Sequence, residues 1–186
     1  MPDNRFPRLV SLACHDLRTP LATIYGFART LTRAGELDER SARFIGMIEE
    51  ASKQMADLLD ELGTAARIES GRWEPVSRPV DTLELAQSDD ERIAVEGTGI
   101  ELEVDAGAVQ RSLTALAVTA IRHGAAERVT WRVVGRVFEL SPVSKAAAPV
   151  VTGEEPKDLG ALVARLVIEE LGGSFQLDGE TLRVTL

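Results

Sequence analysis

Several features are scarce in this sequence of 186 residues, and each scarcity excludes a class of protein. The only cysteine, Cys14, cannot form an internal disulfide and fits a reducing compartment. No apolar run approaches the roughly 18 residues that a membrane-spanning helix needs, and the amino terminus lacks the apolar core of a signal peptide. We therefore expect a soluble, cytoplasmic protein with no membrane partner.

Basic residues are also in deficit, because the formal net charge is −9 at pH 7. Nucleic-acid-binding domains usually carry a basic stripe, so we expect no nucleic-acid partner. With 44% hydrophobic and 27% charged residues, the composition is ordinary for a globular chain of one or two domains.

Histidine is rare as well, and one of the two histidines lies in a notable stretch, His-Asp-Leu-Arg-Thr-Pro-Leu, which begins at His15. In a helix, residues three and four apart share a face, so Thr19 stands one turn above His15, with Asp16 and Arg18 beside them. Pro20 cannot donate to the carbonyl group one turn earlier, which predicts a bend near the histidine.

Apolar residues recur at helical spacing through the first part of the chain. The first predicted helix ends at Gly35, and its apolar residues are Phe6, Val10, Ala13, Leu17, Leu21, Ile24, Ala28 and Leu31. Asp38 is a good N-cap for a second helix from Glu39 to about Ser70, which Gly71 ends. A heptad seam follows this second helix through Phe44, Ile48, Ala51, Met55, Leu58, Leu62 and Ala65.

This apolar surface is too wide for two helices to cover. The economical solution is a pair of hairpins from two chains, which form a four-helix bundle in a homodimer. The alternative is a monomeric hairpin that packs on the second domain.

The second half of the chain alternates short strands and helices. Strands are predicted at 92–95, 100–104, 129–134, 137–140, 175–177 and 181–186, and helices at about 106–124 and 157–171. This order predicts a small two-layer α/β sandwich. The fold class is therefore α+β, with a helical hairpin at 1–72 and an α/β domain at 76–186.

The stretch that begins at His15 resembles the phosphoacceptor box of the dimeric, HisKA-type sensor histidine kinases, and Ala66–Gly71 resembles the end of their second helix. The resemblance implies that His15 carries a phosphoryl group, that Asp16 is its acid/base partner, and that Thr19 positions water when a phosphatase reaction occurs. Arg18 and Pro20 support this box. The chemistry agrees, because a carboxylate that accepts one ring N–H leaves the other nitrogen as a nucleophile.

The second half is similar to the ATP-binding domain of these kinases, but its nucleotide positions are degenerate. The resemblance places Thr119 where an asparagine would hold Mg²⁺, and Pro142 where an aspartate would read adenine. Gly160 of the glycine-rich box is retained, whereas Asp158 replaces the preceding glycine and would repel a triphosphate. Residues 143–156 form a short segment where the family has a long lid, and Lys145 is the one basic residue in this segment. We therefore expect no bound cofactor.

These features favour a histidine phosphotransferase of a two-component phosphorelay, which carries a phosphoryl group on His15 between receiver-domain aspartates without ATP. The receivers would supply Mg²⁺, and autokinase activity is not expected. The alternative is an ATP-dependent histidine kinase, weak or truncated. A third hypothesis is a non-enzymatic scaffold or a response-regulator phosphatase that acts through Thr19. His123 is interpreted as a helix C-terminal residue that the helix dipole favours.

Overall fold

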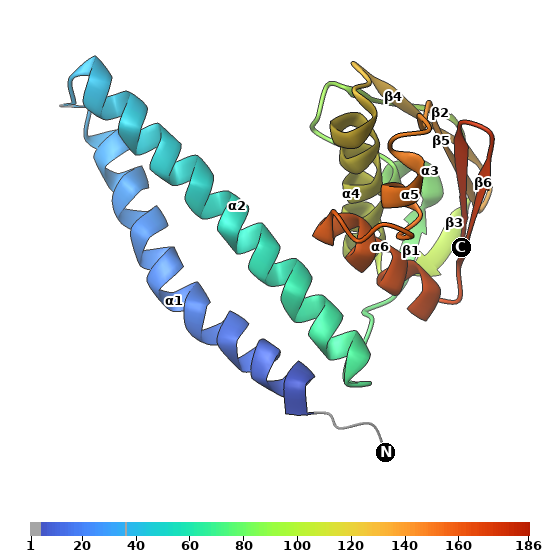
Figure 1. The fold of residues 1–186 in the computed structure, drawn as a ribbon, viewed down its shortest axis with the longest axis horizontal. Helices are drawn as coiled ribbons and strands as arrows, with labels where there is room; N and C mark the ends of the chain where they lie inside the picture. Colours follow the sequence, from blue (N-terminus) through green and yellow to red (C-terminus); the bar gives the residue numbers. More distant parts are fainter. Residues whose placement is uncertain (1–4, 36) are drawn as a thin grey trace. The chain divides into compact units, whose positions relative to one another are not determined.

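The structure is a computed structural model that describes residues 5–35 and 37–186. The described residues divide into two compact units, with the boundary between Arg72 and Trp73. The first unit is helical, and the second combines helices with strands (Figure 1). The α+β fold class predicted from the sequence is confirmed.

The first unit is a hairpin of two long helices, α1 (Arg5–Ala34) and α2 (Glu39–Glu69) (Figure 1). Gly35 follows α1 with a φ of +68°, a left-handed conformation that glycine adopts without steric cost. The Asp38 side chain accepts hydrogen bonds from the backbone N–H groups of Arg40 and Ser41, which caps α2 as the sequence predicts. Hydrogen bonds donated by Ser41 lower the pKa of Asp38 below its usual value.

The two helices pack mostly through small side chains along a line that we call the inner seam. Its buried residues are Cys14, Leu21 and Ala28 on α1 and Ser52, Gly63 and Ala66 on α2. The residues of the predicted heptad behave differently, because Phe44, Met55 and Leu58 remain about half exposed. The hairpin alone therefore leaves most of its large apolar residues uncovered.

The second unit is built on a five-stranded sheet with the order β2-β4-β5-β7-β6. Its strands are β2 (Ile93–Thr98), β4 (Val129–Val134), β5 (Val137–Ser141), β6 (Ser174–Asp178) and β7 (Thr181–Thr185). Strand β2 pairs with β4 in parallel, and the other neighbours are antiparallel. The helices α4 (Ala106–Gly124) and α6 (Leu159–Glu170) lie side by side over one face, which gives the predicted two-layer arrangement (Figure 1).

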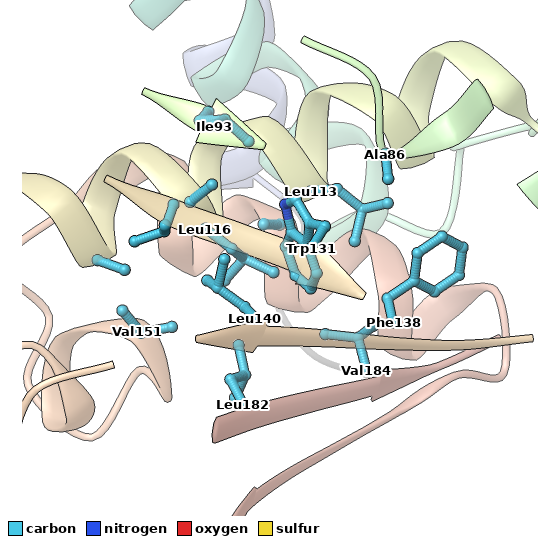
Figure 2. Packing of buried hydrophobic residues seen from close by; sticks show 14 of the residues in the cluster. Ala86, Ile93, Leu113, Leu116, Trp131, Phe138, Leu140, Val151, Leu182 and Val184 are labelled. Atoms are coloured by element: carbon cyan, nitrogen blue, oxygen red, sulfur yellow. The ribbon is translucent and has the colours of Figure 1, made fainter. Parts of the chain in front are cut away.

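The core of this unit lies between that face of the sheet and the helices. Figure 2 shows Trp131 and Leu140 from neighbouring strands beside Leu116 of α4, and all three side chains are fully buried. Trp131 also meets Phe138 edge to face, with ring centroids 6.4 Å apart. Strand residues alternate between this core and the opposite face, where Arg183 Nη2 donates to Glu139 Oε1 at 2.8 Å across two strands.

Three short elements complete the unit. Strand β1 (Arg78–Asp81) pairs with β3 (Glu101–Val104) in a separate two-stranded sheet, and α3 (Thr82–Leu85) follows β1. The four-residue helix α5 (Ala148–Val151) was not predicted, because a run of alanine, proline and valine this short has no recognisable period. Burial of Val150 and Val151 in α5 nevertheless attaches the segment to the domain.

The core contacts predict how much a single side chain contributes to stability. Replacement Leu116→Ala should lower the free energy of unfolding of the second unit by about 2–5 kcal/mol, because it opens a cavity in a fully buried region. The matched control Leu177→Ala, at a side chain 37% exposed on the edge strand β6, should cost less than about 1 kcal/mol. Urea unfolding followed by the fluorescence of Trp131 measures both, and equal losses would contradict this description of the core.

Candidate functional site

His15 lies in the middle of α1, and its side chain is 77% exposed. Its Nδ1 atom is 3.1 Å from Oδ1 of Asp16. In the tautomer with its proton on Nδ1, the neutral ring donates a hydrogen bond to this carboxylate and keeps its lone pair on Nε2. The pair therefore presents a nucleophilic nitrogen to solvent.

Thr19 and Pro20 follow on the next turn of the same helix, and both are exposed. The Thr19 side chain shares the face of His15, as the spacing of four residues predicts. Helix α1 continues through Pro20 without a break. A hydroxyl group thus stands one turn from the imidazole.

Arg18 has a different environment from its neighbours in the box. Its Nε and Nη2 atoms donate to Oδ1 of Asp60 on α2, at 3.0 and 2.6 Å. The guanidinium passes over Gly63, where an added Cβ would lie 3.5 Å from Nη2. The sequence alone did not point to Asp60, because this contact joins residues that are 42 positions apart.

In the second unit, Asp158 is the N-cap of α6 and is almost fully buried. Its Oδ1 accepts from the N–H of Ala161 at 3.2 Å, and its Oδ2 accepts from Arg122 Nη1 at 2.9 Å. Nε2 of His123 lies 3.4 Å from the same Oδ2, a distance that suits an ion pair with a protonated ring but is long for a hydrogen bond. The carboxylate thus occupies the amino-terminal end of α6 and pairs with the last turn of α4.

The other nucleotide positions inferred from the resemblance lie on different elements and differ in exposure. Thr119 is buried in α4, and Gly160 is buried in the first turn of α6. Pro142 is exposed just after β5, and the peptide bond before it is cis. Lys145, also exposed, belongs to the segment that leads into α5. None of these side chains supplies the amide or carboxylate that the resemblance assigns to nucleotide binding.

The segment after β5 is packed against α4. A Cβ on Gly124, the last residue of α4, would lie 3.0 Å from Ser144 Oγ and 3.3 Å from Ala147 Cβ. Val143 and Val151 are fully buried. A phosphate group placed at the amino-terminal end of α6 would meet the buried carboxylate of Asp158.

Residues 5–35 and 37–186 contain no group of three or more His, Cys, Asp or Glu side chains arranged to hold a metal ion. None of the helices described is both long and apolar enough to span a bilayer.

Comparison with known proteins assigns the first unit. Residues 8–71 match the model of the His Kinase A (phospho-acceptor) domain. The hairpin is a HisKA domain. Its match includes His15 and the whole of α2.

Relatives and solved structures extend this result. The chain is 36% identical over 80 residues to the probable sensor histidine kinase TcrY of Mycobacterium tuberculosis, covering 42% of this chain and 16% of TcrY. It is 27% identical over 111 residues to the sensor protein DivL of Caulobacter vibrioides, covering 56% of this chain and 14% of DivL. The crystal structure of full-length ShkA in complex with AMPPNP matches 96% of this chain and 44% of ShkA, with a TM-score of 0.65 and 18% identity.

These findings relate the chain to HisKA-type sensor histidine kinases and to two-component signalling. The chain spans only 16% and 14% of the two curated relatives. The likeness to ShkA shows the fold of the chain, including that of the second unit.

The HisKA domain has two chemically different sides. At 3.6 residues per turn, nine of the exposed large apolar residues of the two helices fall on one side of the plane of the hairpin. We call them the outer stripe: Phe6, Leu17, Ile24 and Leu31 on α1, and Phe44, Ile48, Met55, Leu58 and Leu62 on α2. The same geometry places His15, Arg18 and Asp60 on the opposite side. Covering the outer stripe would therefore leave His15 accessible.

Proposed function

We propose that this protein is a histidine phosphotransferase, which accepts a phosphoryl group on His15 from the aspartate of one receiver domain and passes it to another. The observation that carries the proposal is the exposed His15–Asp16 pair, which offers Nε2 as a nucleophile within a phosphoacceptor domain. HisKA domains in general dimerise and interact with response regulators, which makes receiver domains the expected partners.

The transfer step needs little from this chain. The Nε2 lone pair attacks the phosphorus of an aspartyl phosphate, the P–N bond forms, and the P–O bond to the acyl group breaks with its electron pair on the departing carboxylate. Asp16 accepts the hydrogen bond from Nδ1–H throughout and stabilises the positive charge that develops on the ring. The receiver would supply Mg²⁺, and positioning dominates the catalysis of such a loose, in-line displacement. The return step reverses these bond changes with a second receiver.

The relatives also support a second candidate, an ATP-dependent histidine kinase. TcrY is named a probable sensor histidine kinase, and ShkA has been solved with AMPPNP. Against this candidate stand the buried carboxylate of Asp158 and the side chains of Thr119 and Pro142. We therefore favour transfer without ATP.

The first prediction separates these two candidates. Titration calorimetry with Mg-ATP should show no binding at millimolar nucleotide. The reason is that Asp158 already accepts hydrogen bonds from Arg122 and from the backbone N–H of Ala161 at the N-terminus of α6. Asp158→Gly should not restore binding, since Thr119 and Pro142 still lack the groups that would hold magnesium and adenine. Micromolar binding by the natural chain would favour the kinase.

The second prediction concerns the outer stripe. We propose that the stripe is the interface of a homodimer, because a soluble monomer rarely exposes an apolar patch of this length. Light scattering should give twice the chain mass of 20.1 kDa. Replacing Met55 and Leu62 with Asp should dissociate or unfold the dimer, whereas the same change at exposed Val134 of β4 should do neither. A natural chain that scatters as a monomer would refute the interface.

The third prediction assigns roles within the box. Incubation with a phosphorylated receiver should leave His15→Ala without label, because no neighbouring side chain can form the phosphoramidate. Asp16→Asn should still accept the group, about 10²–10⁴-fold more slowly, through the loss of acid/base assistance. Thr19→Ala should spare transfer and reduce only hydrolysis of the phosphorylated receiver. Label retained on His15→Ala, measured by intact mass, would overturn the assignment.

A further inference from the structure

The side chains of Arg18, Arg67 and Asp60 lie close to one another on the side of the hairpin that carries His15. Nε and Nη2 of Arg18 both donate to the same oxygen of Asp60. Arg67 is also close to Gly63, where an added Cβ would be 3.7 Å from its Nη1 atom. Nη2 of Arg67 donates to the uncharged Thr64 hydroxyl at 3.0 Å, so this group of side chains has an excess of one positive charge.

Arg18 reaches α2 beside Gly63, where a Cβ would be in ordinary van der Waals contact with its Nη2 atom, at 3.5 Å. Cys14 Cβ also lies 3.9 Å from the position that a Cβ of Gly63 would take, so the helices are close at this level. The Arg18 guanidinium is thereby held by its salt bridge to Asp60 and by its position against α2 at Gly63. A long side chain that would otherwise sample many rotamers is fixed in one place.

Arg18 is also a neighbour of His15, because residues three apart on a helix have Cβ atoms about 5–6 Å apart. Two of its five N–H groups bind Asp60, and the Nη1 N–H groups donate to no residue within the described ranges. A phosphohistidine would place three oxygens, with close to two negative charges, on the same side of the hairpin. Guanidinium groups pair with phosphoryl oxygens through charge-assisted hydrogen bonds.

We propose that Asp60 is a positioning residue for phosphoryl transfer: it fixes Arg18 over Gly63 so that the free N–H groups of Arg18 can bind the phosphoryl group on His15. This inference rests on the proposed function. A fixed cation needs no reorganisation when the phosphoryl group arrives, which is the advantage of preorganised electrostatics. Asp60 acts only through Arg18 and does not touch the reacting atoms.

The competing explanation is that the Arg18–Asp60 pair only ties α1 to α2. Reversing the pair separates the two explanations, because Arg18→Asp combined with Asp60→Arg keeps an ion pair between the helices but places a carboxylate beside His15. Arg18→Gln serves as a second variant if the reversed pair does not fold. The matched control reverses Arg165 and Glu169, an ion pair on α6 with 2.7 Å between its charged atoms.

The first measurement needs no receiver. Phosphoramidate can load the phosphoryl group onto His15 chemically, with release of ammonia, and His15→Ala identifies the signal of this group by ³¹P NMR. We expect the pH midpoint of the phosphoryl titration to rise by about half a unit or more in Arg18→Gln and further in the reversed pair, because a nearby cation favours the dianion. The reversed control pair should leave the midpoint unchanged. An unchanged midpoint in Arg18→Gln overturns the inference.

The second measurement follows transfer from a phosphorylated receiver. Asp60→Ala and Arg18→Gln should each slow uptake by about tenfold, and the double variant should be no slower than Arg18→Gln, since Asp60 acts through Arg18. Asp60→Glu should recover part of the rate. Uptake that falls in Arg18→Gln but stays at the natural rate in Asp60→Ala overturns the positioning role. A natural chain that accepts no phosphoryl group refutes the proposed function instead, and the NMR result then still decides whether Arg18 senses a phosphoryl group on His15.

Discussion

The close approach of α1 and α2 through small side chains is the constraint on which the rest of the hairpin depends. Helices packed over Cys14, Gly63 and Ala66 leave room at their interface for few large apolar residues, of which Leu21 is one. Most of the exposed large apolar residues therefore lie to one side, where they form the outer stripe. The same approach lets Arg18 reach across α2 to Asp60. The packing of α1 against α2 thus separates an apolar side of the hairpin from a side that carries His15, Arg18 and Asp60.

That separation makes dimerisation and phosphoryl transfer compatible within a short domain. If the outer stripe pairs with a second chain, burial of apolar surface stabilises the assembly without covering His15. The histidine can then remain 77% exposed, as a receiver domain requires for an in-line approach. A histidine placed on the outer stripe would be covered by the second chain of the dimer and could not contact a receiver domain. The position of His15 around the helix is therefore as important as its chemistry.

The sequence predicted the elements well where a pattern repeats or a cap is present. The heptad and the cap at Asp38 located α2, and the short strand patterns located strands such as β4. It could not predict α5, which is too short to show a period, or the pairing of β3 with β1 in a separate sheet, because pairing depends on contacts distant in sequence. In the site, local spacing gave the His15, Asp16 and Thr19 group. The Arg18–Asp60 contact joins residues 42 apart and required the register of the hairpin.

Asp158 shows how a fold can be kept while a site within it changes. A carboxylate at a helix N-terminus is favourable, and here it also binds Arg122 and approaches His123. The same three partners, a helix N-terminus, a guanidinium and an imidazole, are those that an anionic ligand would use. Because the carboxylate is covalently part of the chain, a free phosphate would have to displace it from these partners. The same side chain therefore caps α6 and, under the proposed function, is one of three positions, with Thr119 and Pro142, that oppose nucleotide binding.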